Sequence, residues 1–376
     1  MAIIYIYKFL QLKYTANGCS IINDNSIECR YSSVGSGSDF TWSLNVGNID
    51  ATPFYAPKTS FAAPSITSYE RIVAIDDKSI TSMDTGGFEV MNIMGINFGP
   101  LSTPVSAIMH AHLGDEFVAT GCKVLDAHTK MQCLTAPGAG LNVIWSLTVD
   151  GLISVQPSTA YAPPTVTSIY LLSGTSKMST DGEETVVIMG TQFGPSGSHF
   201  IDAVSYGPSG TGYTAKNCVV VSTTKIKCST VAGIGENLLW QVSIYGQVSA
   251  RADDVTFSYM VPLITALSPK NGGTIGGNKL LISGSNFNTF DKFGKAYIRW
   301  GSSRTAPLLL ASVDLTSTKF INTLSFYNSK GTGTVDVTVV LYSLLDTILV
   351  ESNAIQFTYD APYIDFITTE TLGNKF

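Results

Sequence analysis

Apolar and polar residues alternate along much of this chain, in short runs bounded by Gly, Ser, Asn and Pro. In "WSLNV" from Trp42, "WSLTV" from Trp145 and "WQVSI" from Trp240, every second residue is apolar. A period of two is typical of a strand with one buried face, and the helical period of 3.6 is nearly absent. We therefore predict an all-β chain in which these three tryptophans point into the cores.

Four similar stretches set a long period. "FAAPSIT", "YAPPTVT", "YMVPLIT" and "YDAPYID" each hold an aromatic residue, two spacers, a proline and the start of a strand. Their prolines, Pro64, Pro164, Pro262 and Pro362, lie 100, 98 and 100 residues apart. This is the length of one immunoglobulin-like sandwich, so the chain is predicted to be a tandem repeat.

A second landmark lies inside each repeat. The stretches are "TGGFEVMNIMGINFG" from Thr85, "TDGEETVVIMGTQFG" from Thr180 and "IGGNKLLISGSNF" from Ile275. Glycines open a strand, apolar residues line it, and a Gly-x-Asn/Gln-Phe turn closes it. We expect glycine where φ must be positive or where the sheet bends, and we expect the phenylalanine to close the end of the core.

Six cysteines occur as three local pairs, in "GCSIINDNSIEC", "GCKVLDAHTKMQC" and "NCVVVSTTKIKC". The spacing is too long for a zinc knuckle, and no histidine follows at ligand distance. Each pair is predicted to bridge one hairpin, which implies an oxidising compartment; the alternative is buried free thiols in a cytosolic protein. The predicted disulfides are Cys19–Cys29, Cys122–Cys133 and Cys218–Cys228.

Together these landmarks resemble tandem IPT/TIG domains, the immunoglobulin-like modules of plexin-type cell-surface proteins and of some transcription factors. The resemblance rests on the Pro-x-Ile/Val-Thr start, the Gly-Gly strand with "GINFG", "GTQFG" and "GSNF", the cysteine pair and the aromatic-x-x-Pro exit. It covers nearly the whole chain. The last whole repeat departs from the pattern, because Val313 stands near the expected first cysteine and Trp300 lies elsewhere, in "YIRWGSS".

The landmarks divide the chain into the rear part of one module (1–61), three whole modules (62–162, 163–260 and 261–360) and the first strand of another (361–376). Proline at each junction restricts the backbone, so we expect an elongated, stiff rod of tandem immunoglobulin-like sandwiches. Two interpretations of the end pieces stay open. The chain is a window on a longer array, or a front strand enters the rear part of a second copy, head to tail. In both, "AIIYIYKFLQL" near the N-terminus is expected to be a strand.

Charge and hydropathy exclude several classes of partner. Only 13% of the residues are charged, the net charge is −6, and no basic run occurs, which argues against nucleic acid. No stretch of about 18 apolar residues occurs, so we expect no membrane span within the chain.

Candidate chemistry is sparse. His110 and His112 share one face of a strand without a third ligand, and acidic clusters at 76–77, 181–184 and 253–254 lack the spacing of a calcium loop. We interpret them as surface imidazoles and turn carboxylates. We therefore predict no catalytic, metal or cofactor site, and no enzyme.

The sequence favours an extracellular structural protein, a component of a surface rod or fibre that extends end to end through contacts with further copies of itself. The alternative is the ligand-binding or adhesion part of a cell-surface receptor ectodomain, with other cell-surface proteins or glycans as partners. A third possibility, an accessory array on a secreted enzyme, needs a catalytic domain that these residues do not hold.

Overall fold

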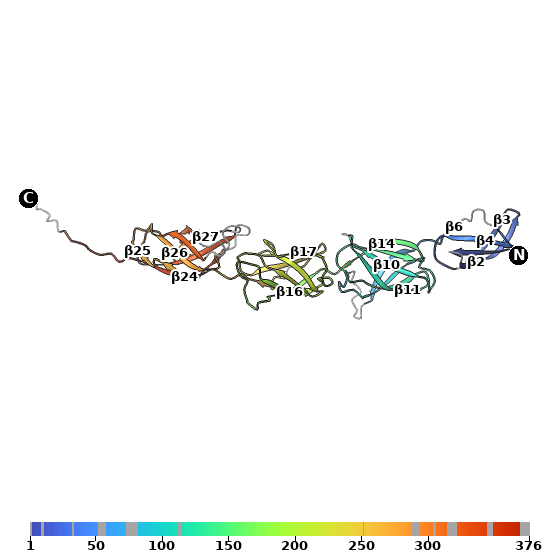
Figure 1. Cartoon of the computed structure of the whole chain (residues 1–376), viewed down its shortest axis with the longest axis horizontal. Helices are drawn as coiled ribbons and strands as arrows, with labels where there is room; N and C mark the ends of the chain where they lie inside the picture. Colours follow the sequence, from blue (N-terminus) through green and yellow to red (C-terminus); the bar gives the residue numbers. More distant parts are fainter. Residues whose placement is uncertain are drawn as a thin grey trace, which may run out of the picture.

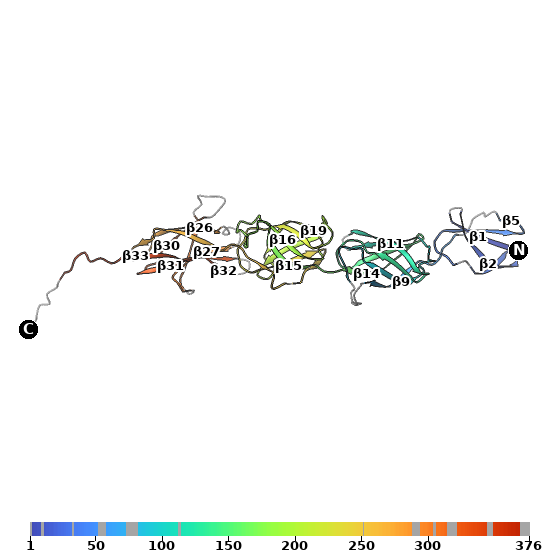
Figure 2. The same cartoon turned by 90° about the horizontal axis from the view of Figure 1, so that it is seen from below.

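The structure, a computed structural model, is an elongated row of sandwiches made of strands and turns. It describes residues 2–8, 11–31, 34–51, 58–72, 82–111, 114–250, 252–287, 294–303, 306–313, 322–343 and 349–368. We name the successive parts unit 1 (2–61), unit 2 (62–162), unit 3 (163–260) and unit 4 (261–360). Two perpendicular views place the units in a row, with unit 1 at one end and the segment after unit 4 at the other (Figures 1 and 2). The all-β prediction is confirmed.

Unit 3 has two sheets. Its strands are β15 (Thr165–Leu171), β16 (Thr185–Thr191), β17 (Ile201–Gly207), β18 (Tyr213–Thr214), β19 (Lys216–Ser222), β20 (Lys225–Ser229), β21 (Leu238–Ile244), β22 (Gln247–Val248) and β23 (Thr256–Phe257). One sheet has the order β15-β16-β20-β19, and the other β18-β17-β21-β22 with β23 beside β21. Alternate residues of both sheets face inward, as Ile188 on β16 and Trp240 on β21 do. The apolar residues that recur at every second position in the sequence are therefore the ones whose side chains are buried between the sheets.

Unit 2 repeats this layout with one longer strand. Its strands are β7 (Ser65–Ile72), β8 (Ser82–Met83), β9 (Val90–Ile96), β10 (Val105–His110), β11 (Glu116–Asp126), β12 (Lys130–Leu134), β13 (Val143–Val149) and β14 (Leu152–Tyr161). Their order is β7-β9-β12-β11-β10-β13-β14-β8. Strand β11 passes from one layer to the other. It therefore occupies the positions that two separate strands, β18 and β19, occupy in unit 3.

Unit 4 again has two sheets. Its strands are β24 (Leu263–Ser268), β25 (Asn271–Gly272), β26 (Lys279–Ser285), β27 (Gly294–Trp300), β28 (Leu308–Leu310), β29 (Ser312–Val313), β30 (Thr323–Tyr327), β31 (Thr334–Ser343), β32 (Leu349–Glu351) and β33 (Ile355–Tyr359). The orders are β24-β26-β30-β29 and β25-β33-β31-β27-β28, with β32 beside β31. Trp300 is 6% exposed and lies in this core, so the displaced tryptophan is still a core residue.

Unit 1 has a single sheet. Its strands are β1 (Ala2–Lys8), β2 (Gln11–Asn23), β3 (Ser26–Tyr31), β4 (Phe40–Val46), β5 (Ile49–Asp50) and β6 (Lys58–Thr59). The order is β3-β2-β1-β4-β5, with β6 beside β4. Strands β1 to β4 match β10 to β13 of unit 2, and no described strand takes the places of β7 and β9. The predicted N-terminal strand is divided, since β1 ends at Lys8 and β2 runs back beside it from Gln11.

The tryptophans differ in burial between units. Trp145 and Trp240 are 0% and 1% exposed, as expected of core residues. Trp42 is only partly buried, and its indole nitrogen donates to the Thr59 hydroxyl at 2.7 Å. No described strand of unit 1 takes the place of β7, whose Tyr69 ring lies 5.4 Å from that of Trp145 in unit 2.

The three cysteine pairs are disulfides within hairpins. The bonds join Cys19 to Cys29, Cys122 to Cys133 and Cys218 to Cys228. In each case the residue before the first cysteine has a positive φ, 64° at Gly18, 61° at Gly121 and 51° at Asn217. Glycine and asparagine are the residues that tolerate this conformation, which explains why the recurring phrase begins with "GC" or "NC".

Candidate functional site: the joints between units

The closing turn of each Gly-x-Asn/Gln-Phe landmark lies at a joint between units. Asn97 and Asn286 occupy it with φ of 64° and 63°. The Asn97 side-chain nitrogen donates to the Ala63 carbonyl at 3.0 Å, and that of Asn286 donates to the Val261 carbonyl at 2.9 Å. Both acceptors directly precede the proline that starts a unit. The turn therefore fastens the linker to the unit that follows it.

In unit 3 the same position is Gln192, whose longer side chain reaches the preceding unit. Its Nε2 donates to the Asp84 carboxylate at 3.0 Å, and its Oε1 accepts from the Thr85 backbone N–H at 2.8 Å. The Gly194 N–H also donates to the Thr85 hydroxyl, at 3.3 Å. These contacts connect residues about 107 positions apart and tie unit 2 to unit 3.

A second recurring position faces the next unit from the end of each core. It is Ser36 in unit 1, Ala139 in unit 2 and Ile234 in unit 3. The Ser36 hydroxyl donates to the Asp150 carboxylate of unit 2 at 3.3 Å. Ile234 is 2% exposed and belongs to the core cluster of unit 4. One position thus makes a polar contact at joint 1–2 and an apolar contact at joint 3–4.

Aromatic rings fill joint 2–3. The Phe200 ring lies 5.8 Å from Phe117 and 5.1 Å from Tyr245, edge to face in both pairs. The three side chains belong to one continuous cluster of buried apolar residues that runs through units 2 and 3. Edge-to-face pairs add about 0.5–1.5 kcal/mol beyond the area they bury. Units 2 and 3 therefore share a core.

A carboxylate completes joint 2–3. The Tyr245 hydroxyl donates to Asp115 Oδ2 at 2.5 Å, and His199 Nε2 lies 3.2 Å from the same oxygen. The Tyr245 hydrogen bond is the main cause that lowers the pKa of the Asp115 carboxyl, with a further contribution from His199. Gln247 of unit 3 also donates to the Tyr161 carbonyl of unit 2, at 2.9 Å. These polar contacts surround the aromatic ones.

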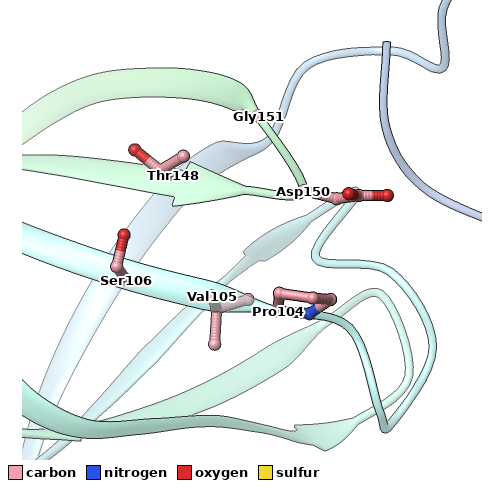
Figure 3. Close-up of a pocket in the computed structure, with 6 residues that line it drawn as sticks. All are labelled: Pro104, Val105, Ser106, Thr148, Asp150 and Gly151. Carbon is pink, nitrogen blue, oxygen red and sulfur yellow. The ribbon is translucent and has the colours of Figure 1, made fainter. Parts of the chain in front are cut away.

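Joint 1–2 has small or polar residues where joint 2–3 has rings. Counted from the tryptophans of β13 and β21, Asp150 stands where Tyr245 does, and both have positive φ, 45° and 47°. Pro104 precedes β10 as Phe200 precedes β17. The replacements leave a hollow of about 320 Å³ over the start of β10 and the end of β13 (Figure 3). It is lined by Pro104, Val105, Ser106, Thr148, Asp150 and Gly151.

A second hollow at this joint is lined from both units and measures about 380 Å³. Its lining is Val34, Gly35, Ser36, Phe61, Ala62, Asn97, His128 and Leu152. Two hollows thus lie at joint 1–2, and the first is lined by Pro104 and Asp150, where unit 3 has Phe200 and Tyr245.

The residues singled out for metal chemistry are dispersed. His110 Nδ1 lies 3.3 Å from Glu116 Oε1 on the sheet surface of unit 2, and His112 lies outside the described residues. Within 181–184, Glu184 accepts from the Ser179 N–H at 2.5 Å, a turn contact, while burial raises the pKa of the Asp181 carboxyl. The 76–77 cluster also falls outside the described residues. Among those described, no group of three His, Cys, Asp or Glu side chains is placed to hold a metal ion.

The contacts at joint 2–3 could not be read from the sequence. Asp115 and Tyr245 fall in no landmark, and the landmark that holds Gln192 does not show that its side chain reaches the preceding unit. Their partners lie in another repeat, beyond the reach of local patterns. The one usable signal is the alignment itself, which places Gln192 where Asn97 and Asn286 stand.

Comparison with known proteins bears on unit 4. Residues 262–359 match the model of the IPT/TIG domain. Unit 4 is therefore similar to the IPT/TIG domain family. It is the unit without a cysteine pair, so the match does not include a disulfide. The sequence-based resemblance to IPT/TIG domains is confirmed there.

The search of curated proteins gave no match. Among solved structures, the chain is similar to the full extracellular region of plexin A4, with 12% identity and a TM-score of 0.26 over 95% of this chain and 34% of that one. The Escherichia coli adhesin FdeC is 10% identical, with a TM-score of 0.22 over 80% of this chain and 96% of that one. Titin domains A168–A170 are 9% identical, with a TM-score of 0.24 over 79% of this chain and 99% of that one. The chain thus spans about a third of the length of the plexin region.

No membrane-crossing helix, long and apolar enough for that purpose, occurs in the part of the chain that the structure describes.

Proposed function

We propose that this chain is an extracellular structural rod, in which stacked IPT/TIG-like units hold a fixed spacing and extend end to end. The observation that carries the proposal is joint 2–3. There the buried apolar cluster continues from unit 2 to unit 3, and Gln192 and Tyr245 bond across the boundary. Flexible arrays need solvated linkers instead. The role is mechanical and involves no chemical step.

The disulfides support an extracellular setting. Units 1, 2 and 3 each contain one disulfide, and disulfides persist in oxidising compartments and are rare in the cytosol. Charged residues are sparse, at 13% of the chain. The partner we propose is a further copy of the same array, joined end to end.

A second candidate function is adhesion or ligand binding, and the outer sheet face of unit 2 favours it. Val118, Ile144 and Ile153 are 60%, 41% and 59% exposed on β11, β13 and β14. The adjacent pair of His110 and Glu116 lies on the same face. Exposed β-branched side chains grouped on one sheet face are suited to contact with another protein.

Small-angle X-ray scattering of the 376-residue chain tests the rod. At concentrations low enough that single chains prevail, we expect a cross-section of one unit and a maximum dimension close to four units in line. Because apolar packing dominates joint 2–3, the profile should not change between low and high salt. A profile that requires a broad ensemble of bent shapes would contradict the proposal and favour the adhesion candidate, in which units present their loops independently.

A further inference from the structure

The hairpin of β2 and β3 in unit 1, which the Cys19–Cys29 disulfide joins, exposes apolar side chains that units 2 and 3 bury. Ile21 and Ile27 face each other across β2 and β3. The matching cross-strand pair is Val124 and Met131 in unit 2, which are 5% and 0% exposed. Ile21 is 54% exposed and Ile27 only partly buried. Unit 3 agrees with unit 2, since the pair Val220 and Ile226 is 2% and 0% exposed.

In whole units this pair belongs to a row across four strands. Met131 on β12 lies beside Ile93 on β9, and Ile93 lies beside Tyr69 on β7. In unit 3 the corresponding row ends with Ile188 and Ile169. In unit 1 the row stops at β3, whose far edge has no neighbour among the described strands. This edge offers both unpaired backbone groups and an apolar face.

A segment with the pattern of a first strand lies beyond unit 4. Residues 361–368 follow the fourth exit motif, and Pro362 aligns with the prolines before β7, β15 and β24. Counted from the proline, Ile364 takes the place of Ile66 and Val166, which are 8% and 6% exposed. Ile364 itself is 79% exposed. The side chain that whole units bury at this place is thus solvated here.

The second apolar position of the segment fits as well. Ile367 stands where Ile169 and Leu267 stand, three residues after the first inward position. Each first strand has a register shift directly after that position, which brings the third residue rather than the second onto the inner face. Leu267 is 2% exposed, and Ile367 is 79% exposed. The spacing of Ile364 and Ile367 is therefore that of a strand made to pack on a sandwich core.

We propose that residues 363–368 of one chain add as a β-strand to the free edge of β3 in a second copy. Ile367 then extends the row formed by Ile21 and Ile27, Ile364 lies farther along the same face, and the backbone groups of β3 gain partners. The added segment lies directly beside β3, in the position that β9 has beside β12 in unit 2. In a whole unit the first strand is one position farther out, beside β9. This proposal rests on the proposed end-to-end rod and names its contact.

The arrangement is head to tail. The donor segment and the β3 edge lie at opposite ends of the row of units (Figure 1). Each copy can therefore give one strand and receive one, which produces an open chain of copies and not a closed dimer.

Sedimentation velocity over a concentration series tests the contact. We expect the wild-type chain to form a growing series of oligomers. The double variant Ile364→Asp/Ile367→Asp should weaken association by at least about ten-fold, because two apolar anchors are lost and charges would be buried. The matched control is Ile275→Asp, since Ile275 is 90% exposed in unit 4 and lies in neither surface. The donor substitutions fall in an exposed segment, so the folded units should persist.

A mixing experiment gives the sharper outcome. The acceptor variant Ile27→Asp keeps its donor segment, and the donor variant keeps its β3 edge. Neither should oligomerise alone, but their mixture should give one-to-one dimers and nothing larger. A wild-type chain that stays monomeric, or a donor variant that associates as the wild type does, would overturn the proposal. If the same monomer still scatters as a straight rod, the proposed stiffness of the single chain stands and the end-to-end contact fails.

Discussion

At the scale of single residues, the glycine of the Gly-x-Asn/Gln-Phe landmark lies against two groups, a backbone carbonyl of the neighbouring strand and the ring of the landmark phenylalanine. A Cβ added at Gly284 would lie 2.1 Å from the Leu263 carbonyl oxygen and 2.5 Å from the Phe287 ring. Gly95 and Gly190 are equally crowded. The phenylalanine, 0% exposed, lies over its own glycine at the end of the core. The sequence predicted that this ring closes the core; it could not show that the glycine makes room for it.

Gly284→Ala should therefore destabilise unit 4. We expect a loss of about 1–3 kcal/mol in the free energy of unfolding, since the new methyl group must displace backbone and ring. The matched control is Gly273→Ala, where an added Cβ meets nothing within 4 Å and the φ is not positive. Its effect should stay within about 0.5 kcal/mol. Denaturant unfolding compares the two, and equal losses would show that the close approach is not the cause.

Buried tyrosines make units 2 and 3 sensitive to alkali. Burial raises the pKa of the Tyr69, Tyr161, Tyr206 and Tyr259 hydroxyls above the ordinary value of 10.0. Below about pH 10 these groups are protonated in both the folded and unfolded chain. Above it only the unfolded chain releases protons, so the free energy of unfolding should fall as the pH rises. Unfolding followed from pH 8 to 11 measures this fall.

Tyr161→Phe separates this effect from other titrations. The Tyr161 hydroxyl donates to the Ala136 carbonyl at 2.8 Å, so its removal should cost about 1 kcal/mol at neutral pH. The loss of stability above pH 10 should become shallower by up to about 1.4 kcal/mol per pH unit. Phe61 already occupies this place in unit 1, so the ring alone is tolerated. An unchanged slope would exclude Tyr161 as a source of the alkaline instability.

At the scale of elements, the hairpins were the most predictable part of the molecule. The cysteine spacing and the "GC" or "NC" start indicate a disulfide across two short strands. The three disulfides join the strands of these hairpins. Unit 4 builds the same hairpin from β29 and β30 without cysteines. The division of the N-terminal stretch into β1 and β2 was not predicted, because an apolar run without Gly or Pro carries no turn signal.

Removing one disulfide should weaken its own unit and leave unit 4, which has a separate core, unchanged. Cys122→Ala/Cys133→Ala opens a loop with a sequence separation of 11, which should lower the stability of unit 2 by about 2–3 kcal/mol. Hydrogen exchange read by mass spectrometry resolves the units. Faster exchange is expected in unit 2, with unit 4 as the internal control. Equal acceleration in unit 4 would mean that the units unfold together.

At the scale of the whole molecule, the repeat and its rod shape could be predicted, but the chemistry of the joints could not. The period near 100 residues and the prolines without linkers indicate units in line. What fills each joint depends on residues that differ between repeats, such as Asp150 and Tyr245. Because the Tyr245 hydroxyl lowers the pKa of Asp115, its contribution to joint 2–3 is present at neutral pH and lost as the pH falls through that lowered pKa.

Tyr245→Asp places at joint 2–3 the residue type found at joint 1–2. It removes a ring that is 2% exposed and sets a second carboxylate near Asp115, so we expect joint 2–3 to lose about 2–4 kcal/mol of packing. Scattering should then require bent shapes that the wild type does not. Tyr327→Asp is the control, since Tyr327 is 64% exposed in unit 4, away from joint 2–3 and from the donor segment. A straight variant would show that the aromatic contacts do not set the stiffness.

Electron microscopy of single chains, with the angle between successive units measured at every joint, tests the central claim most directly. The packed joint 2–3 predicts a narrow distribution of angles near a straight line, and the hollows at joint 1–2 predict a wider one. A wide distribution at joint 2–3, equal to that at joint 1–2, would contradict the account of this chain as a stiff rod built from shared cores.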